Sequence, residues 1–504
     1  MRTLFGISVR SPAFGPAIVL FLALLWATAA SAQKPERGSD QILSGTITGS
    51  DHQRYIRAPF VLPEGTERLV VSFDYDGRDH KTVIDLGIED PHGFRGASGG
   101  NKASFTIAPT DATPSYLPGP LPAGEWALAL AVPNIREGVT AQWQAELWFL
   151  RGAEAQWLPD APAGRGPGWY RGDLHLHTAH SDGSCDSRSG QRVPCPTYRT
   201  IEAAADRGLD FVALTEHNTA SQAAPLRELA PYFDDMLLIP AREITTFYGH
   251  FNVYGVTSFL DFRIAKGSDN SFADIAEQVR SLGGLVSINH PRLPSGEICM
   301  GCGWTMPGAD LAHADAVEVI NGSSSASGGG PEGPVSGIPF WVEALAQGHR
   351  LAAIGGSDNH DPARSGDGAV GVPATVVYAE DLSQGAILEG LRRGRSFIDV
   401  EGSGQVHLDF TVRTGEATAK MGGRLRVSDS APIALIADLK APVGTMLEVL
   451  VGTDLIEARP LDGRSDSHTF SLTAERGTRP VWLKLRNSDG DLVALSSALV
   501  LDVE

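Results

Sequence analysis

Short apolar runs alternate with stretches of helical periodicity between residues 169 and 400. One helical stretch begins with Ser271 and Asp274, which form a capping-box pattern, and it ends at the pair Gly283 and Gly284. This alternation is typical of parallel βα units, so we expect an α/β core. The expected strands are residues 173–177, 211–215, 236–239, 251–256, 285–288, 316–320 and 351–354.

The segments on either side of this core have the period-two alternation of β-strands. Residues 68–74 and 126–132 are examples before it, and residues 433–437 and 481–485 are examples after it. A stretch rich in Pro and Gly separates the first flank from the core. We therefore expect a β-sandwich domain over residues 33–157, a linker over 158–168, the α/β domain over 169–400 and a second β-sandwich over 401–504.

The segment of residues 323–330 is of low complexity, rich in Ser and Gly. We expect it to be a loop, either a plain solvent-exposed connection or a lid. The two sandwiches also leave a choice open, because they could bind glycans or only pack against the core.

The first 32 residues have the order of a secretory signal. Arg2 and Arg10 precede an apolar run over residues 17–26, and the small residues Ala30, Ser31 and Ala32 follow. We expect cleavage after Ala32; the alternative is an uncleaved anchor, for which the apolar run is short. The expectation is a secreted or periplasmic protein without a membrane span.

The net charge limits the classes of partner, and the length sets the expected number of domains. The 504 residues include 60 acidic and 41 basic side chains, a formal net charge of −19, with no evident basic patch. Such a surface repels nucleic acid and anionic lipid, so neither is expected as a partner. A chain of this length should form two to four domains. The oligomeric state is not predicted.

Four cysteines lie in the expected loops, namely Cys185, Cys195, Cys299 and Cys302. In an exported protein they allow two disulfides in three connectivities, of which local pairing is the simplest. A zinc knuckle or a redox pair at Cys299 and Cys302 is the alternative. A redox motif would have to open a helix after a strand, and the Gly-rich surroundings disfavour that.

Histidines and carboxylates gather at the ends of the expected strands. Nine of the 14 histidines lie in the α/β segment, and in residues 173–177 strand periodicity places Asp173, His175 and His177 on one face. Parallel strands bring their carboxyl ends to one rim, so these side chains should meet. The candidate metal ligands are His175, His177, Asp182, His217, Glu243, His250, His290, Asp358 and His360.

Nine nitrogen and oxygen donors exceed the three or four that one catalytic zinc takes from a protein. They indicate two to three divalent transition metal ions, with Glu243 as a bridging carboxylate. Imidazole and carboxylate together suit Zn, Mn or Fe. Hydrogen-bonded core histidines are the alternative, but they would not explain why nearly every strand end carries one.

The motifs resemble those of a known family. Asp-Leu-His-Leu-His-Thr at 173–178, Leu-Thr-Glu-His at 214–217, Glu243, His-Pro at 290–291 and Ser-Asp-Asn-His at 357–360 are similar to the ordered motifs of the polymerase and histidinol phosphatase (PHP) superfamily of metal-dependent hydrolases. The nearest branch is the carbaryl-hydrolase-like one. The resemblance covers residues 169–400 and implies a distorted (β/α)7 TIM-like barrel between the two sandwiches.

The resemblance also implies how the ligands divide among the metals. One metal would be held by His175, His177, Glu243 and Asp358, a second by Asp182, His217 and His360, and a third by Glu243, His250 and His290. Asp173 would orient neighbouring groups. Glu216 stands where the family often has Asp.

The expected function is an exported hydrolase that uses a metal-bound hydroxide on a small-molecule ester, with Glu243, Asp358 and His360 as catalytic residues. Arg242 and Arg292 flank the ligands and would either hold an anionic substrate or balance charge. Phosphomonoesters or phosphodiesters are the leading substrates, and carbamates or carboxyl esters are the alternative. A rival of another class is a non-catalytic envelope protein that binds metal only structurally.

Overall fold

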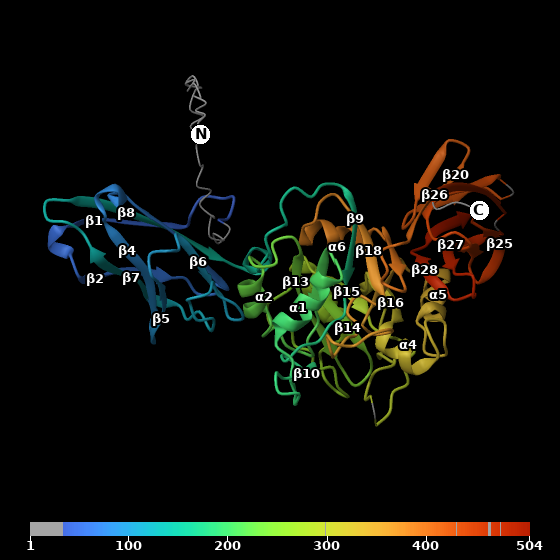
Figure 1. Ribbon diagram of the computed structural model, residues 1–504, viewed down its shortest axis with the longest axis horizontal. Helices are drawn as coiled ribbons and strands as arrows, with labels where there is room; N and C mark the ends of the chain where they lie inside the picture. The colour runs from blue at the N-terminus through green and yellow to red at the C-terminus, as the bar shows by residue number, and fades with distance from the viewer. Residues whose placement is uncertain (1–33, 298, 430, 462–464, 474) are drawn as a thin grey trace, which may run out of the picture.

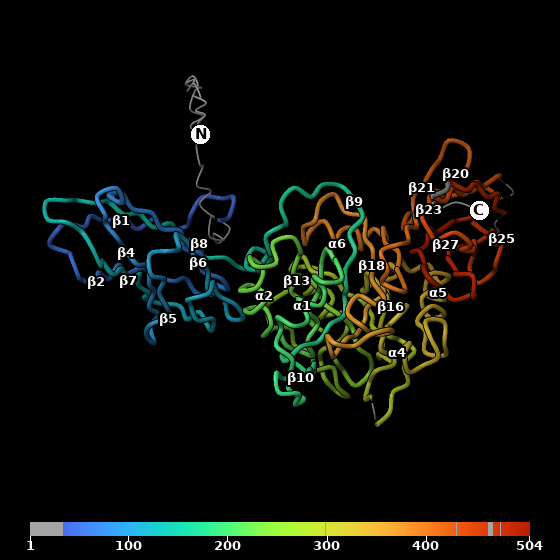
Figure 2. Tube along the Cα trace, viewed as in Figure 1, coloured from blue at the N-terminus to red at the C-terminus, as the bar shows by residue number. Residues whose placement is uncertain are grey.

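The computed structural model describes residues 34–297, 299–429, 431–461, 465–473 and 475–504. Figure 1 shows three parts in a row along the long axis, in the order of the sequence, and the Cα trace in Figure 2 follows the same order. The expected signal segment, residues 1–32, lies outside the described residues. Within the described ranges, no helix is long and apolar enough to cross a membrane.

The N-terminal part consists of two four-stranded antiparallel sheets that share one hydrophobic core. Apolar and polar residues alternate along these strands; β8, for example, buries every second residue over most of its length. The first sheet has the order β1 (Gln41–Thr48), β8 (Thr140–Leu150), β3 (Arg68–Tyr75), β6 (Ser104–Ile107). The second has the order β2 (Arg54–Leu62), β7 (Gly124–Asn134), β4 (Val83–Asp90), β5 (Gly93–Ser98).

Six of the seven strands expected in the central segment are present, with ends shifted by a few residues; the first was placed too late, because its strand ends at Asp173 and residues 174–177 follow it with only an isolated bridge at Leu176. The strand order in the sheet follows the sequence: β9 (Gly168–Asp173), β12 (Phe211–Leu214), β13 (Leu237–Thr245), β14 (His250–Tyr254), β15 (Leu285–Ile288), β16 (Ala316–Asn321) and β17 (Ala352–Gly356). The helices are α1 (Thr197–Asp206), α2 (Ala223–Leu229), α3 (Phe272–Ser281), α4 (Gly322–Gly328), α5 (Ile338–Ala346) and α6 (Gln384–Arg392).

Strand β14 runs against its neighbours, which corrects the expectation of parallel units throughout. It pairs antiparallel with both β13 and β15, whereas β9, β12 and β13 pair parallel, as do β15, β16 and β17. Thr245 at the end of β13 faces His250 at the start of β14. The reversal therefore brings the first residue of β14 to the rim where the parallel strands end.

The seven strands do not close into a regularly paired barrel. Beyond the strand ends, the segment after β9 meets the segment after β17 at an isolated bridge between Leu176 and Asn359. The His177 N–H donates to the Asn359 carbonyl at 2.9 Å, and the Asp358 N–H donates to the His175 carbonyl at 2.9 Å. The mixed α/β class is confirmed, while a closed (β/α)7 barrel is not.

Of the helices, α3 begins at the capping box that the sequence predicted, whereas α4 was not predicted. Helix α3 begins with the expected capping box, in which the Asp274 N–H donates to Ser271 Oγ at 3.2 Å and the Ser271 N–H to the Asp274 carboxylate at 3.0 Å. Helix α4 lies where we expected a loop. Asn321 caps it by accepting the Ser324 N–H at 2.8 Å, and Gly329 ends it in the left-handed region.

The C-terminal part is continuous with the central sheet. Strand β19 (Ser396–Asp399) pairs with β28 (Leu492–Ser496), so the ladder crosses the expected boundary at residue 400. The other strands on that side are β27 (Gly477–Arg486), β24 (Met446–Val451), β25 (Asp454–Pro460), β29 (Leu499–Val503) and β22 (Arg424–Val427). A separate sheet has the order β21 (Ala417–Lys420), β20 (His407–Thr414), β23 (Ile433–Lys440), β26 (Ser465–Leu472).

A buried ion cluster joins the N-terminal part to the central one. Both carboxylate oxygens of Asp111 lie 2.7 Å from the guanidinium of Arg68, and Arg227 of α2 donates to the same carboxylate at 2.7 Å. A cavity of about 790 Å³ opens beside this cluster, lined by Trp157 among others, and none of the nine candidate ligands lines it.

Candidate metal centre

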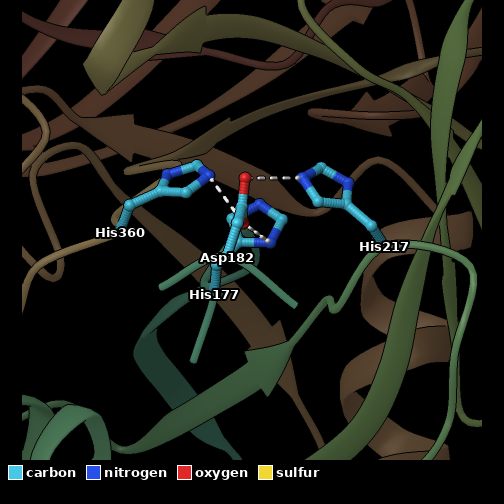
Figure 3. A group of neighbouring side chains, drawn as sticks. All are labelled: His177, Asp182, His217 and His360. Carbon is cyan, nitrogen blue, oxygen red and sulfur yellow. Dashed lines mark ion pairs between the residues drawn. The ribbon is translucent and has the colours of Figure 1, made fainter. Parts of the chain in front are cut away.

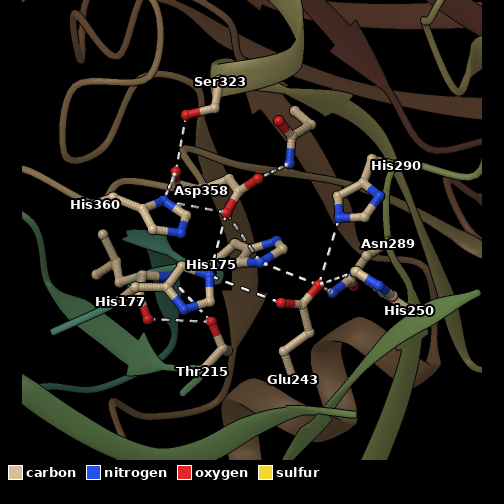
Figure 4. Close-up of polar contacts among 12 residues, drawn as sticks. His175, His177, Thr215, Glu243, His250, Asn289, His290, Ser323, Asp358 and His360 are labelled. Carbon is tan, nitrogen blue, oxygen red and sulfur yellow. Dashed lines mark hydrogen bonds and ion pairs between the residues drawn. The ribbon is translucent and has the colours of Figure 1, made fainter. Parts of the chain in front are cut away.

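All nine candidate ligands converge at the rim of the central sheet. Their donor atoms form four overlapping groups, in each of which one atom per residue lies within 4.8 Å of the others. Figures 3 and 4 show the side chains pointing toward one another from different strands and loops. The groups are His177, Asp182, His217 and His360; His175, His177 and Glu243; His175, His290 and Asp358; and Glu243, His250 and His290.

The outer group consists of His177, Asp182, His217 and His360 and lies nearest to solvent. Asp182 is the centre of it, with its carboxylate 3.2 Å from His360 Nε2, 3.5 Å from His217 Nε2 and 4.0 Å from His177 Nδ1 (Figure 3). The side chain of Asp182 is 57% exposed and that of His360 is 37% exposed. A small molecule could therefore reach this end of the site.

Two of the four groups share His175, and we call their residues His175, His177, Glu243 and Asp358 the central group; His290, the remaining member, also belongs to the inner group. Asp358 Oδ1 lies 3.1 Å from His177 Nε2 and 3.4 Å from His175 Nε2. Glu243 lies 3.6 Å from His175 Nε2 and 3.8 Å from His177 Nε2 (Figure 4). Two carboxylates thus face two imidazoles in a region that excludes most solvent.

The inner group consists of Glu243, His250 and His290, all buried. Glu243 Oε1 lies 3.3 Å from His250 Nδ1 and 3.4 Å from His290 Nε2. Its other oxygen lies 2.9 Å from His217 Nδ1. Glu243 therefore stands between all three groups, as a bridging carboxylate would.

The donor set fits divalent cations. Among the described residues, the Nε2 atoms of His175 and His250 are buried without any hydrogen-bond partner. An orphaned buried nitrogen costs free energy unless something binds it. His175 Nε2 faces the carboxylates of Glu243 and Asp358, whereas His250 turns its other ring nitrogen, Nδ1, toward Glu243. Imidazole and carboxylate donors are those that Zn, Mn and Fe accept.

Neighbouring carboxylates raise the pKa of two histidines of the outer group. Burial lowers the pKa of His217, but hydrogen bonds to Asp182 and Glu243 raise it to about 10 overall. Burial also lowers the pKa of His360, but the hydrogen bond to the Asp182 carboxylate raises it, and the overall value is about 9. Burial raises the pKa of Glu243, yet His175 and His250 hold it well below its usual range. Cation binding would therefore release protons.

Glu318 is a functional residue that the sequence analysis missed. Its Oε1 lies 3.0 Å from His175 Nδ1, and its Oε2 accepts the His290 N–H and the Asn321 side-chain amide, each at 3.0 Å. A carboxylate behind a ligating imidazole fixes the tautomer and the ring orientation. The sequence did contain a signal for this role: Glu318 is the only charged residue in the apolar run 316–320, and a buried carboxylate is rare unless it is paired.

Replacing Glu318 with Gln should weaken metal binding or activity by about 10–100-fold, the usual effect of removing such a carboxylate. The fold should survive, because the amide retains an acceptor for the His290 N–H. Metal titration of the stripped protein measures the effect, with the exposed Glu343→Gln as the matched control. Equal affinity of both variants would contradict the orienting role.

Two more buried carboxylates organise the backbone around the site. Glu216 accepts the Thr178 N–H at 3.1 Å and the hydroxyls of Thr178 and Ser181 at 2.6 Å and 2.5 Å. Asp173 accepts the backbone N–H groups of His175, Ser357 and Gly371. Burial raises the pKa of Asp173 to about 6 against these hydrogen bonds. Both residues therefore hold the ligand-bearing loops, as expected of Asp173.

Backbone strain coincides with the candidate ligands. His290 has a φ of 24° and Asp358 a φ of 52°, in the left-handed region that side chains other than glycine rarely adopt. Such conformations cost about 1–3 kcal/mol each and persist where surrounding contacts impose them. Their occurrence at two candidate ligands is typical of a functional site.

The structure corrects the role expected of Arg242. Glu243 points into the site, so its neighbour on the strand points away. The buried guanidinium of Arg242 donates to the carbonyls of Val256 at 3.0 Å and Ser258 at 2.7 Å. It is engaged in the fold and does not face the donor groups.

Arg292 and Arg364 lie in loops that follow candidate ligands. Arg292 is exposed, and no hydrogen bond or ion pair with another described residue is found for it. Arg364, which sequence reasoning missed, donates to Ser323 Oγ at 3.1 Å, and that hydroxyl donates to the Asp358 carbonyl at 2.8 Å (Figure 4). In the sequence, only the position of Arg364 in the loop after His360 could have indicated that it lies near the site.

Both local disulfides are present. Cys185 pairs with Cys195, with a Cα–Cα distance of 4.9 Å, and Cys299 pairs with Cys302 at 5.7 Å. The simplest connectivity is confirmed, and the zinc-knuckle alternative is wrong because no described cysteine is free.

No protein-family model matches the chain. A curated relative, an uncharacterized protein of Methanocaldococcus jannaschii, is 29% identical over 152 residues, which are 30% of this chain and 81% of the relative. A solved two-domain protein of Bacteroides vulgatus, containing a predicted PHP-like metal-dependent phosphoesterase, matches at 18% identity and a TM-score of 0.35, over 68% of this chain and 98% of that one. A candidate metal-dependent phosphoesterase of Bifidobacterium adolescentis matches at 17% identity and a TM-score of 0.27, over 42% and 91%. Because these TM-scores are low, the site's own geometry must decide the function.

Proposed function

We propose that this protein is a metal-dependent hydrolase of the PHP type whose substrates are phosphomonoesters or phosphodiesters. The observation that carries the proposal is the convergence of the donor groups on Glu243, together with the orphaned Nε2 atom of His175. When bound, divalent cations supply a nucleophilic hydroxide near neutral pH and polarise the phosphoryl oxygen.

The three donor groups have different roles in this proposal. The central group would hold a cation between its two carboxylates and two imidazoles, of which only Asp358 is partly exposed. The inner group would hold a second one through Glu243, His250 and His290. The outer group would bind a cation where substrate enters, and the half-exposed His360 would contact the ester there.

Phosphate esters suit the site better than neutral esters because of charge. Arg292 follows the ligand His290 by two residues, and Arg364 donates to the Ser323 hydroxyl that contacts the Asp358 carbonyl. A guanidinium pairs well with phosphoryl oxygens. We make these two residues, in place of Arg242, the proposed substrate-binding cations. Carbamate or carboxyl-ester hydrolysis of the carbaryl-hydrolase type requires neither of them.

A substrate panel tests the proposal on one preparation loaded in turn with Zn²⁺, Mn²⁺ or Fe²⁺. We expect turnover of p-nitrophenyl phosphate or its bis ester, and no turnover of 1-naphthyl carbamates. Turnover of carbamates alone would favour the alternative substrate class. Bound metal with no turnover of any ester would instead favour a binding protein.

Metal removal should abolish the hydrolysis. We expect two to three divalent cations for each chain by mass spectrometry of the purified protein, and complete loss of turnover after dialysis against a chelator. Adding the same metal back should restore turnover. Full activity in a preparation stripped of metal would contradict the proposed chemistry.

Export completes the proposal. The predicted signal segment over residues 1–32 and the two disulfides both suit an oxidising compartment. Protein isolated from the periplasm or the medium should begin at Gln33. An intact N-terminus in the reducing cytoplasm would contradict this part of the proposal.

A further inference from the structure

The two disulfides lie directly behind two of the three donor groups. Cys185 and Cys195 join the hairpin of β10 (Ser184–Asp186) and β11 (Arg192–Pro194), which follows Asp182 in the chain. Cys299 and Cys302 lie in the loop after His290. The backbone contacts of each bridge reach the loops that carry candidate ligands.

The bridge between Cys185 and Cys195 fixes the turn that presents Asp182. The Ala179 N–H donates to the Cys195 carbonyl at 2.7 Å, and the Cys195 N–H donates to the Gly183 carbonyl at 2.9 Å. Cys195 thus holds the chain on both sides of Asp182. The carboxylate itself is half exposed and contacts the three histidines of the outer group.

The same hairpin also holds His360. The Ser184 N–H, next to Cys185, donates to the His360 carbonyl at 2.7 Å. Arg192 of the opposite strand donates to Ser184 Oγ at 3.0 Å and to the Asp361 carboxylate at 2.6 Å. Two of the four outer ligands therefore take their positions from the hairpin that this disulfide closes.

The bridge between Cys299 and Cys302 acts on the inner group. The Cys302 carbonyl accepts a hydrogen bond from His290 Nδ1 at 3.2 Å, which leaves Nε2 of that ring 3.4 Å from Glu243. The Trp304 N–H donates to the Pro291 carbonyl at 2.9 Å, so the loop folds back onto the residue after His290. The disulfide constrains the carbonyl that orients this imidazole.

The central group has supports of another kind. Asp358 accepts the Asn321 side-chain amide at 3.2 Å, and His175 is backed by Glu318. Both Asn321 and Glu318 belong to strand β16, which contains no cysteine. Reduction of either disulfide would leave these contacts in place.

We propose that the two disulfides are positioning elements of the metal centre, each for one cation: Cys185 and Cys195 for the outer group, Cys299 and Cys302 for the inner group. This inference rests on the proposed metal binding and not on the choice of substrate. Reduction of each bridge by a trialkylphosphine and water yields two thiols and one phosphine oxide. The reduced protein would keep its central cation and bind the other two more weakly.

Metal stoichiometry tests the proposal without any substrate. The variants Cys185→Ser/Cys195→Ser and Cys299→Ser/Cys302→Ser are dialysed, with the parent, against buffered free Zn²⁺ and measured by mass spectrometry. We expect each variant to lose about 10–100-fold in affinity for one cation, the effect of losing a ligand's orienting contact. The other cations should bind as in the parent, which also shows that the fold persists.

Two controls separate the bridge from other causes. Ser187→Ala alters the same hairpin without touching the disulfide and should bind metal as the parent does. The phosphine should reproduce both losses in the parent, and it should change nothing in a variant lacking all four cysteines, which excludes chelation by the reductant.

Several outcomes would overturn the inference. Variants that bind every cation with parental affinity would show that the bridges do not position ligands. Variants that lose all cations equally, with an altered circular dichroism spectrum, would show that the bridges only stabilise the fold. A parent that binds no divalent cation would overturn the proposed function as well, whereas a loaded parent with unaffected variants would leave that function standing.

Discussion

Replacing Asp358 with Ala is expected to lower hydrolysis by about 10⁴-fold or more, the scale on which loss of an essential catalytic group falls. The carboxylate is the nearest anionic partner of His177 Nε2, at 3.1 Å, and it also faces His175 Nε2 at 3.4 Å. Its truncation leaves the central imidazoles without the anion that would hold a cation between them. Steady-state kinetics and metal content of the same preparation measure both consequences.

A matched control lies in the loop that follows. Asp367 is exposed, and Asp367→Ala removes the same charge while the donor groups remain intact. This variant should retain parental kcat/KM and metal content. If Asp358→Ala behaved as Asp367→Ala does, the central group would have no part in the reaction.

Replacing Asp111 with Ala should destabilise the protein by about 3–5 kcal/mol, the cost of breaking a buried ion pair by removing one partner. Arg68 and Arg227 would both lose their carboxylate, and each guanidinium is nearly buried. Differential scanning calorimetry should show the transition of the N-terminal part at a lower temperature. Activity of the folded variant should be unchanged, since the ion-pair partners of Asp111 are Arg68 and Arg227, neither of which is a candidate ligand.

An exposed ion pair in the same sheets provides the comparison. Arg57 pairs with Glu125 at 3.0 Å, and both side chains are more than half exposed. Glu125→Ala should leave the unfolding transition close to that of the parent, because exposed pairs contribute little to stability. Similar losses in both variants would show that burial does not strengthen the Asp111 cluster.

The Asp111 effect should also depend on pH. Burial raises the pKa of this carboxyl, but Arg68 and Arg227 hold it below its usual value. A carboxyl with a lowered folded-state pKa contributes stability above its unfolded pKa of about 3.9, and this contribution is lost as the pH falls through the folded value. The difference between parent and Asp111→Ala should therefore shrink in acid.

Local patterns predicted the strands and the site residues because both depend on neighbours in the sequence. The apolar runs of the core give strands wherever they are bounded by turns. The period of two predicted that His175 and His177 share one face; both converge on the site, although they follow the end of β9 at Asp173. The nine candidate ligands needed only one further rule, that strand ends share a rim. For this reason they could be named before their geometry was known.

The direction of β14 could not be predicted in that way. Its antiparallel pairing is set by contacts with β13 and β15, which the apolar run at residues 251–256 does not reveal. Arg242 was misread although strand alternation with Glu243 already placed it on the opposite face. Helix α4 was missed because its stability comes from Asn321 and Gly329 at its ends, since its Ser and Gly residues are weak helix formers.

The reversed strand has a consequence for how the metal centre forms during folding. Glu243 and His250 belong to one tight hairpin of β13 and β14, so closing the loop between them costs little chain entropy. His177 and Asp358 are 181 residues apart in the chain and meet only after most of the sheet has formed. Contacts between near neighbours form sooner than contacts between distant segments. The half of the site around Glu243 should therefore exist early in folding, and Asp358 should join it last.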